Sequence, residues 1–130
     1  MQVSELQAGF APDPYAQNCP SRTVLDRIGD RWTVLVVGTL SHAPARFSEL
    51  SRAIEGVSQK MLTQTLRGLE RDGLVTRTVH PEVPPRVVYD LTEAGRTLIE
   101  PLAALDAWAR THLADIEESR RRFDERSASA

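Results

Sequence analysis

The order of patterns between Arg46 and Leu91 constrains the fold of this chain more than any other feature. Two short helical patterns come first, and two β-rich runs separated by a proline-rich segment follow them. Apolar residues at three- and four-residue spacing indicate helices, whereas β-branched runs bounded by prolines indicate strands. We therefore expect a mixed α+β fold, mainly helical, with one β-hairpin after two closely spaced helices.

The first of these two helices is short. Phe47, Leu50 and Ile54 form an apolar stripe at helical spacing, and Ser48 is predicted to be its N-cap. Gly56 follows the stripe and suits the positive φ at the exit of a tight turn. The pattern predicts a helix that packs one face on the core and leads through a tight turn into the next helix.

The second helix is predicted from an N-cap at Ser58 to about Asp72, with Gly73 just beyond its end. At about 100° per residue, three of its residues fall within one narrow arc that faces the core. These are Leu62, Leu66 and Leu69. The opposite arc and the first turn are polar, as expected for a helix that presents side chains to DNA. They hold Gln59, Lys60, Thr63, Gln64, Arg67 and Arg71.

Two runs with strand composition, residues 74–79 and 86–91, flank the segment 80–85. That segment contains three prolines and no Asn-Gly pair, so the turn is expected to be longer and stiffer than a two-residue hairpin loop. Two helices joined by a tight turn and followed by such a hairpin make a winged helix-turn-helix. Its second helix is expected to enter a groove of DNA.

The segments before Arg46 indicate an arm and two further helices. Residues 1–18 contain one glycine and two prolines but few large apolar groups, so we expect a flexible arm. Two helical patterns follow from Ser21, separated by Gly29 and Asp30. We expect two packed core helices with a tight joint. Their apolar faces hold Val24, Leu25 and Ile28 in the first, and Trp32, Leu35, Val36 and Leu40 in the second.

The C-terminal third predicts a long helix capped by Thr92 and kinked or split at Pro101. Its apolar seam is wider than a domain of this size needs for its own core, so we expect the helix to pack against a second copy. The seam consists of Leu98, Leu102, Leu105, Trp108, His112 and Ile116. The composition turns polar near Arg120, where the helix is expected to fray. The predicted organisation is a flexible arm, a winged helix-turn-helix domain with a dimerisation helix, and a frayed polar tail, over residues 1–18, 19–118 and 119–130.

The composition narrows the class of protein. With 41% hydrophobic and 26% charged residues, the chain has the composition of a soluble globular domain, and no apolar run is long enough to span a membrane. No basic residue precedes Arg22, which argues against a signal peptide. The single cysteine, Cys19, excludes an intrachain disulfide and a cysteine-rich zinc site and favours the reducing cytoplasm. The net charge of −2 gives no support for a nucleic-acid partner, although residues 46–91 carry seven basic and six acidic residues.

Several short motifs between Asn18 and Ala109 carry a family resemblance. They are Cys19-Pro20, Ile28-Gly29-Asp30-Arg31-Trp32, Arg46-Phe47-Ser48-Glu49-Leu50, Ser58-Gln59-Lys60-Met61-Leu62-Thr63, Leu69-Glu70-Arg71-Asp72-Gly73-Leu74-Val75 and Pro81-Glu82-Val83-Pro84-Pro85-Arg86-Val87. Together they resemble the HxlR family of transcriptional regulators, close in fold to the MarR-type winged helices. The resemblance implies a homodimeric DNA-binding repressor or activator, with residues 58–72 in the major groove and the wing, 77–86, near the backbone. Arg31 and His80 depart from the family, which often has Lys and Tyr there.

Within the second helix, Ser58 to Arg67 is the predicted DNA-binding segment. Lys60 and Arg67 are expected to contact phosphates, whereas Gln59, Thr63 and Gln64 are expected to contact base edges, because Gln pairs with adenine and the Thr methyl with thymine. The alternative for the same arc is a solvated helix face without a partner.

The predicted wing contributes three further candidates. Arg77 and Arg86 flank it and are expected to contact phosphates or the minor groove, with Arg86 favoured because it lies within a matching motif. The alternative is an ion pair with Glu82 or Asp90, which adds little stability at an exposed site. His80 is a weaker candidate, because imidazole meets phosphate only as a donor.

Cys19 is the candidate redox site. In several members of the family that the chain resembles, a cysteine at the matching place senses oxidants, quinones or aldehydes. Only the thiolate reacts, and Arg22 or the N-terminus of the following helix is expected to lower the pKa of Cys19. A lone thiol can switch by a disulfide to the Cys19 of a second copy, by a mixed disulfide or by an adduct. The alternative is a small buried apolar residue.

The function predicted from the sequence is sequence-specific transcriptional regulation by a homodimer. The expected partners are a double-stranded DNA operator, a second copy and a small-molecule or electrophile effector. Acidic residues occur before and within the first motif helix, but no nucleophile, glycine-rich phosphate loop or metal cluster accompanies them, so we expect neither an enzyme nor a cofactor. Two alternatives stay open, a nucleoid-associated structural protein that binds DNA without sequence preference and a winged-helix module that binds proteins only.

Overall fold

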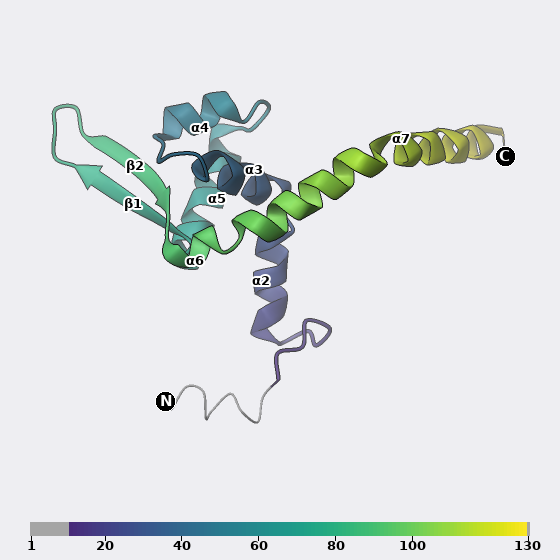
Figure 1. The fold of residues 1–130 in the computed structure, drawn as a ribbon, viewed down its shortest axis with the longest axis horizontal. Coiled ribbons are helices and arrows are strands. Elements are labelled where there is room, and N and C mark those ends of the chain that lie inside the picture. The colour runs from purple at the N-terminus through teal and green to yellow at the C-terminus, as the bar shows by residue number, and fades with distance from the viewer. Residues whose placement is uncertain (1–10, 130) are drawn as a thin grey trace.

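The structure, a computed structural model, describes residues 11–129 as a mainly helical fold with one two-stranded antiparallel sheet (Figure 1). The mainly helical α+β class and the winged helix-turn-helix arrangement predicted from the sequence are confirmed. The predicted arm at 1–18 lies largely outside the described residues. The elements are α2 Pro20–Ile28, α3 Arg31–Leu40, α4 Phe47–Ala53, α5 Gln59–Arg71, β1 Val75–His80, β2 Arg86–Leu91, α6 Glu93–Arg96 and α7 Ile99–Ser129.

The core lies between α3, α4, α5 and the base of the sheet. The three leucines predicted to hold α5 to the core, Leu62, Leu66 and Leu69, are fully buried, and so are Leu40 and Leu50 of the neighbouring helices. The amphipathic pattern is enough to predict this, because three- and four-residue spacing puts the three leucines on one side of any helix. A rigid core therefore holds α5, with its polar arc turned outward.

The prediction that α2 is a core helix was wrong. None of its residues is buried, and Val24 and Leu25 are 56% and 52% exposed. Figure 1 shows α2 extending away from the body of the domain, below α3 and α5. Leu35 of α3, also expected in the core, is 44% exposed. Periodicity identifies the apolar face of such a helix, but only tertiary packing decides whether the same chain covers it.

The turn between α4 and α5 has the predicted glycine geometry. Gly56 adopts φ +88°, a conformation that side chains with a Cβ rarely take. The predicted N-cap Ser48 of α4 is corrected to Arg46, which precedes the helix with extended φ and ψ. The carboxylate of Glu49 accepts a hydrogen bond of 2.8 Å from the Arg46 backbone N–H, which satisfies one of the free donors at this end of the helix.

The wing is an antiparallel pair in which Val75 lies opposite Leu91 and His80 opposite Arg86. Its base is fixed to the body at two places. Ala45 and Tyr89 exchange backbone hydrogen bonds of 2.9 and 2.8 Å, and the Thr92 N–H donates to the Leu74 carbonyl at 3.0 Å. The Val83–Pro84 peptide bond in the turn is cis. These anchors hold the wing beside the end of α5.

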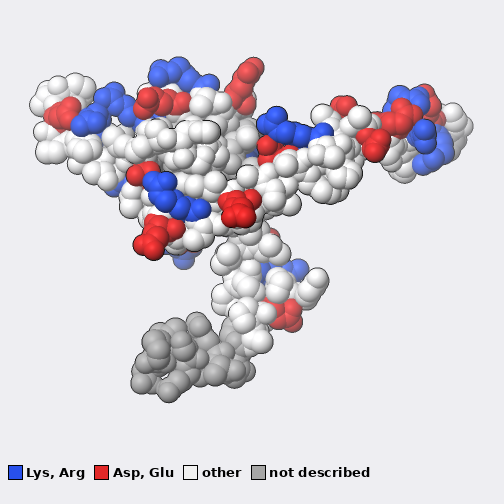
Figure 2. Space-filling view, in the orientation of Figure 1, with Lys and Arg blue, Asp and Glu red and all other residues white. Residues whose placement is uncertain are grey.

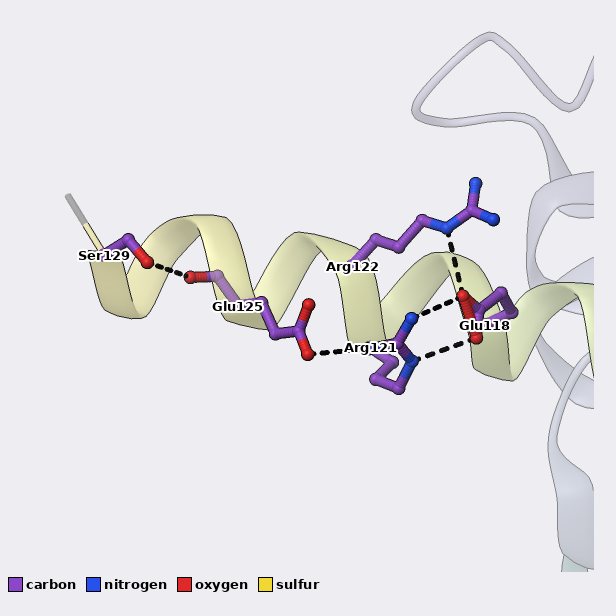
Figure 3. A network of polar contacts seen from close by, with 5 residues as sticks. All are labelled: Glu118, Arg121, Arg122, Glu125 and Ser129. Atoms are coloured by element: carbon purple, nitrogen blue, oxygen red, sulfur yellow. Dashed lines mark hydrogen bonds and ion pairs between the residues drawn. The ribbon is translucent and has the colours of Figure 1, made fainter.

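The last predicted helix is split into α6 and α7, so Pro101 stands in the first turn of α7, where its missing N–H is not needed. The predicted frayed tail was wrong, because α7 continues to Ser129. Ion pairs at three- and four-residue spacing support this extension (Figure 3). Hydrogen bonds from Arg121, and to a smaller extent Arg122, lower the pKa of Glu118. No helix in the described range 11–129 is long and apolar enough to cross a membrane.

Candidate nucleic-acid interface

The polar arc of α5 is held open to solvent at its N-terminal end. Ser58 has extended backbone angles, and its hydroxyl accepts a hydrogen bond of 3.1 Å from the Met61 N–H, as an N-cap does. Ser58 itself is exposed. The predicted cap is thus confirmed, and it starts the helix at a defined residue. The side chains of the first turn then leave the helix in fixed directions.

The predicted contact residues of α5, from Gln59 to Arg67, form what we call the recognition face. All are exposed except Thr63, which is half-buried. Within residues 11–129, none of their side chains forms a hydrogen bond or an ion pair. Their polar groups are therefore free for phosphates or base edges. The recognition face consists of Gln59, Lys60, Thr63, Gln64 and Arg67.

Met61 also lies in the first turn of α5 and was missed by the sequence analysis. It is 37% exposed, although the next residue, Leu62, is fully buried. An exposed apolar side chain next to polar ones can contact a thymine methyl group. The only sequence signal was its place in the first turn, where periodicity alone assigns it to the edge of the apolar arc.

The two wing arginines have different environments. The guanidinium of Arg86 donates to Glu82, with Nε and Nη2 at 3.0 and 2.9 Å from Oε2, so Arg86 forms one of the ion pairs named as the alternative. Arg77 is exposed and, among the described residues, has no ion pair. His80 is half-buried at the end of β1. The free guanidinium of the wing is therefore that of Arg77.

The charges on the surface are mixed. Figure 2 shows Lys and Arg side chains interspersed with Asp and Glu on the face it presents, without one continuous basic area. This agrees with the net charge of −2 and with the near balance of charge over residues 46–91. A single copy therefore has little long-range attraction for DNA, and its contacts must come from a few local groups.

Cys19 precedes α2 as its N-cap and is only 5% exposed. Its Sγ lies 3.1 Å from the Ser21 hydroxyl and accepts a hydrogen bond of 3.1 Å from the Asp13 N–H. Hydrogen bonds from the Ser21 side chain, and then from the backbone of Asp13 and Ser21, lower the pKa of Cys19. The helix N-terminus predicted as a cause thus contributes through the Ser21 N–H, whereas Arg22 does not.

The predicted interface residues of α7 divide into two groups. Leu102 is 4% exposed and is corrected to a core residue, whereas Leu98 is half-buried and packs against the core. Leu105 and Trp108 are 59% and 56% exposed, and the Trp108 ring stacks on His112 with centroids 4.5 Å apart. Phe123, one heptad beyond Ile116, is 60% exposed and was missed because the tail was expected to fray. The apolar stripe of α7 is Leu105, Trp108, His112, Ile116 and Phe123.

A hollow of about 560 Å³ lies between α3 and α7. Leu35 and Gly38 line it from α3, and the ion-paired Asp106 and Arg110 line it from α7. A volume of this size suits a small organic molecule. Over residues 11–129, no group of three or more His, Cys, Asp or Glu side chains is arranged to hold a metal ion.

Comparison with known proteins agrees with this architecture. The model of the HxlR-like helix-turn-helix family matches residues 27–117. The HTH-type transcriptional regulator YtfH of Escherichia coli (strain K12) is 45% identical to the chain over 127 residues, with 98% of each chain covered. The solved structure of the transcriptional regulator ytfH from Salmonella typhimurium has a TM-score of 0.79 at 40% identity and covers 85% of this chain and 99% of its own. The redox regulator HypR in its oxidized form has a TM-score of 0.66 at 40% identity, with 72% and 96% covered.

Proposed function

Because the chain belongs to the HxlR-like helix-turn-helix family of transcriptional regulators, we propose that it acts as a homodimer on a pseudo-palindromic operator, with one α5 in each major groove. The observation that carries the proposal is the recognition face, whose side chains are exposed except for the half-buried Thr63 and make no polar contact among the described residues, while three buried leucines fix the helix beneath them. A capped helix on a rigid core presents its first turn to base edges in a constant geometry. We expect this operator binding to take place in the cytoplasm.

The second copy is needed for tight binding. A single recognition face offers two basic side chains, Lys60 and Arg67, and the net charge of −2 adds no general attraction to DNA. Two faces on one rigid dimer raise the affinity by bivalency without new contacts. The apolar stripe of α7 and the exposed Val24 and Leu25 of α2 supply apolar area that a second copy covers. Half-sites about one helical turn apart follow from such symmetry.

Arg67→Ala is the direct test of the recognition face. Loss of one phosphate contact per protomer should weaken operator binding to a similar degree on all operator variants and reduce the salt slope by about one per contact. Binding is measured by fluorescence anisotropy at several salt concentrations, on duplexes that the wild-type protein selects from random sequence. Arg121→Ala is the matched control, because it removes the same charge on the far side of α7 from the apolar stripe. Unchanged affinity of Arg67→Ala would contradict the assignment of α5.

We further propose that Cys19 is the switch that electrophiles and oxidants use. The lowered pKa supports this, since more thiolate is present at a given pH, and so does the likeness to the redox regulator HypR. With diamide, the thiols of the two Cys19 residues in a dimer lose two protons and two electrons, form one S–S bond and reduce the reagent to its hydrazine. With a quinone, the thiolate adds to a ring carbon. Either product would change the geometry between the two recognition helices.

Cys19→Ser is expected to abolish release of DNA by diamide while it leaves DNA binding of the reduced protein intact.

Ser21→Ala tests whether the hydrogen bond from Ser21 lowers the pKa of Cys19. Without the Ser21 hydroxyl, the pKa of Cys19 should rise, so that less thiolate is present near neutral pH. In a plot of the iodoacetamide alkylation rate against pH, the increase should therefore be shifted to higher pH than in the wild-type protein. A Cys19→Ser protein that releases DNA normally, or identical pH–rate curves for Ser21→Ala and wild type, would count against the proposed switch.

A further inference from the structure

Arg27, in the last turn of α2, lies across the recognition helix. Its Nε donates a hydrogen bond of 3.0 Å to Oδ2 of Asp72, the residue that ends α5. The Arg27 guanidinium also occupies the space beside Gly68, where the Cβ of any other residue would overlap it. The pair is partly buried, with side chains 28% and 35% exposed. Arg27 therefore contacts the last turn of α5 and its C-cap.

Gly68 in α5 and Asp72 at its C-cap are both unfavourable for a helix on their own, and both lie against Arg27. Glycine inside a helix destabilises the helix relative to alanine, and Gly68 lies within α5 and not in a turn that would require glycine. Asp72 puts a carboxylate at the helix C-terminus, where the helix dipole disfavours negative charge. Gly68 makes room for the guanidinium, and the guanidinium offsets the charge of Asp72. Local rules broken in this way are expected at sites where function needs them.

The contact matters because α2 is otherwise weakly held. α2 has no buried residue, and within residues 11–129 the Arg27–Asp72 pair is the one side-chain hydrogen bond from α2 to another helix or strand. Apart from this pair, α2 is connected to α3 by the short joint through Gly29 and Asp30 and by packing against α3. A helix joined to the domain only by its backbone can change its angle, and the Arg27–Asp72 pair adds a second constraint beside that joint, to α5 instead of α3.

We propose that Arg27 is a positioning residue that fixes the angle between α2 and the recognition helix, and thereby sets the operator spacing that the dimer accepts. The inference rests on the proposed function, since it takes α5 to contact DNA and the apolar face of α2 to contact a second copy. α2 then belongs to the dimer interface at one end and touches the recognition helix at the other. The distance between the two α5 helices depends on this angle.

The first test measures the spacing preference with Arg27→Met, which keeps the apolar stem and removes the charge. Operators selected from random sequence by the wild-type protein are altered by one base pair between the half-sites. With two broken pairs per dimer, affinity for the selected spacing should fall about tenfold and the preference over altered spacings should shrink, while binding to an isolated half-site stays at the wild-type level. Arg27→Lys keeps the charge, so its affinity and spacing preference should lie between those of the wild-type protein and Arg27→Met.

Two further variants separate positioning from folding. The exchange Arg27→Asp with Asp72→Arg restores an ion pair and should restore the spacing preference. Gly68→Ala favours the helix but displaces the guanidinium, so it should loosen the spacing preference without lowering Tm. Arg27→Met with unaltered spacing preference, or with an equal loss on isolated half-sites and full operators, would overturn the proposal.

A measurement without DNA keeps failure of this inference distinct from failure of the proposed function. Nitroxides are attached through Thr23→Cys on α2 and Glu70→Cys on α5, in a Cys19→Ser chain diluted with unlabelled chain. Pulsed electron paramagnetic resonance should give a narrow distance distribution that Arg27→Met broadens and the charge exchange narrows again. Identical distributions with and without Arg27→Met would reject the positioning role, whether or not DNA binds. A wild-type protein that selects no DNA sequence would reject the proposed function alone.

Discussion

Gly95→Ala is expected to lower the free energy of unfolding by about 3 kcal/mol, because the added methyl has no room. Gly95 is buried in α6, and a Cβ there would overlap the backbone carbonyl oxygen of Leu74 and press on the Leu91 side chain. The carbonyl cannot rotate away, since it accepts the Thr92 N–H at 3.0 Å. The joint between α5, the wing and α6 must therefore shift, and Tm should fall by roughly 10 °C or more.

The joint is also fixed by the Thr92 side chain. Its hydroxyl donates to the Gly73 carbonyl at 2.6 Å and accepts from the Gly95 N–H at 3.0 Å. A shift at Gly95 thus disturbs the end of α5 as well as the start of α6. DNA affinity should fall together with stability in this variant.

Gly38→Ala is the matched control, measured by thermal and chemical denaturation beside Gly95→Ala. Gly38 is within α3, and a Cβ there meets no atom within 4 Å. The same chemical change should therefore be neutral or stabilising by about 0.5–1 kcal/mol, because alanine favours a helix interior. Equal stability of the two variants would contradict the expected overlap between a Cβ at residue 95 and the Leu74 carbonyl.

Trp108→Asp is expected to convert the proposed dimer into a monomer and to weaken operator binding by about 100-fold or more. The ring is 56% exposed in the single chain and stacks on His112 within the apolar stripe of α7. A carboxylate placed in an interface that a second copy covers must lose its water without gaining a partner. Binding through one recognition face then lacks the gain that bivalency provides.

Molecular mass in solution, measured by sedimentation and light scattering, gives the first readout and DNA binding the second. Ala114→Asp is the matched control, because residue 114 is exposed on the opposite side of α7 at about 100° per residue. The control should remain a dimer with full affinity. A dimeric Trp108→Asp protein would contradict the placement of the interface on this stripe, and a monomeric Ala114→Asp protein would show that any charge on α7 has the same effect.

Local chemistry explains what the sequence predicted correctly. The three leucines of α5, the cap at Ser58, the glycine turn at Gly56 and the two strands of the wing depend on spacing and on backbone preferences a few residues long. Such preferences act within a segment and need no knowledge of its neighbours. The recognition face follows from them, because it is the side of α5 that the leucines leave outside.

The incorrect predictions concern which face of a helix is buried and which residues its side chains contact. The stripe from Leu98 to Ile116 was treated as one surface, yet Leu102 packs in the core and Leu105 stays exposed. The polar residues after Arg120 were expected to fray, but Glu118, Arg121 and Glu125 form ion pairs along a continuing helix. These pairs contribute only about 0.2–0.5 kcal/mol each, so composition alone gave little sign of them.

The sequence by itself determined the helices and strands of the winged helix-turn-helix, the residue at which the helix of the recognition face begins, and which of its residues face the core. Those properties follow from the periodicity of the chain and from the conformations that glycine, proline and capping residues prefer. Only the tertiary structure decided that α2 stands outside the core, that Arg86 pairs with Glu82, and that Arg27 crosses Gly68 to reach Asp72. Asp72 is 45 residues from Arg27, and contacts over such separations depend on how the elements pack rather than on any local pattern.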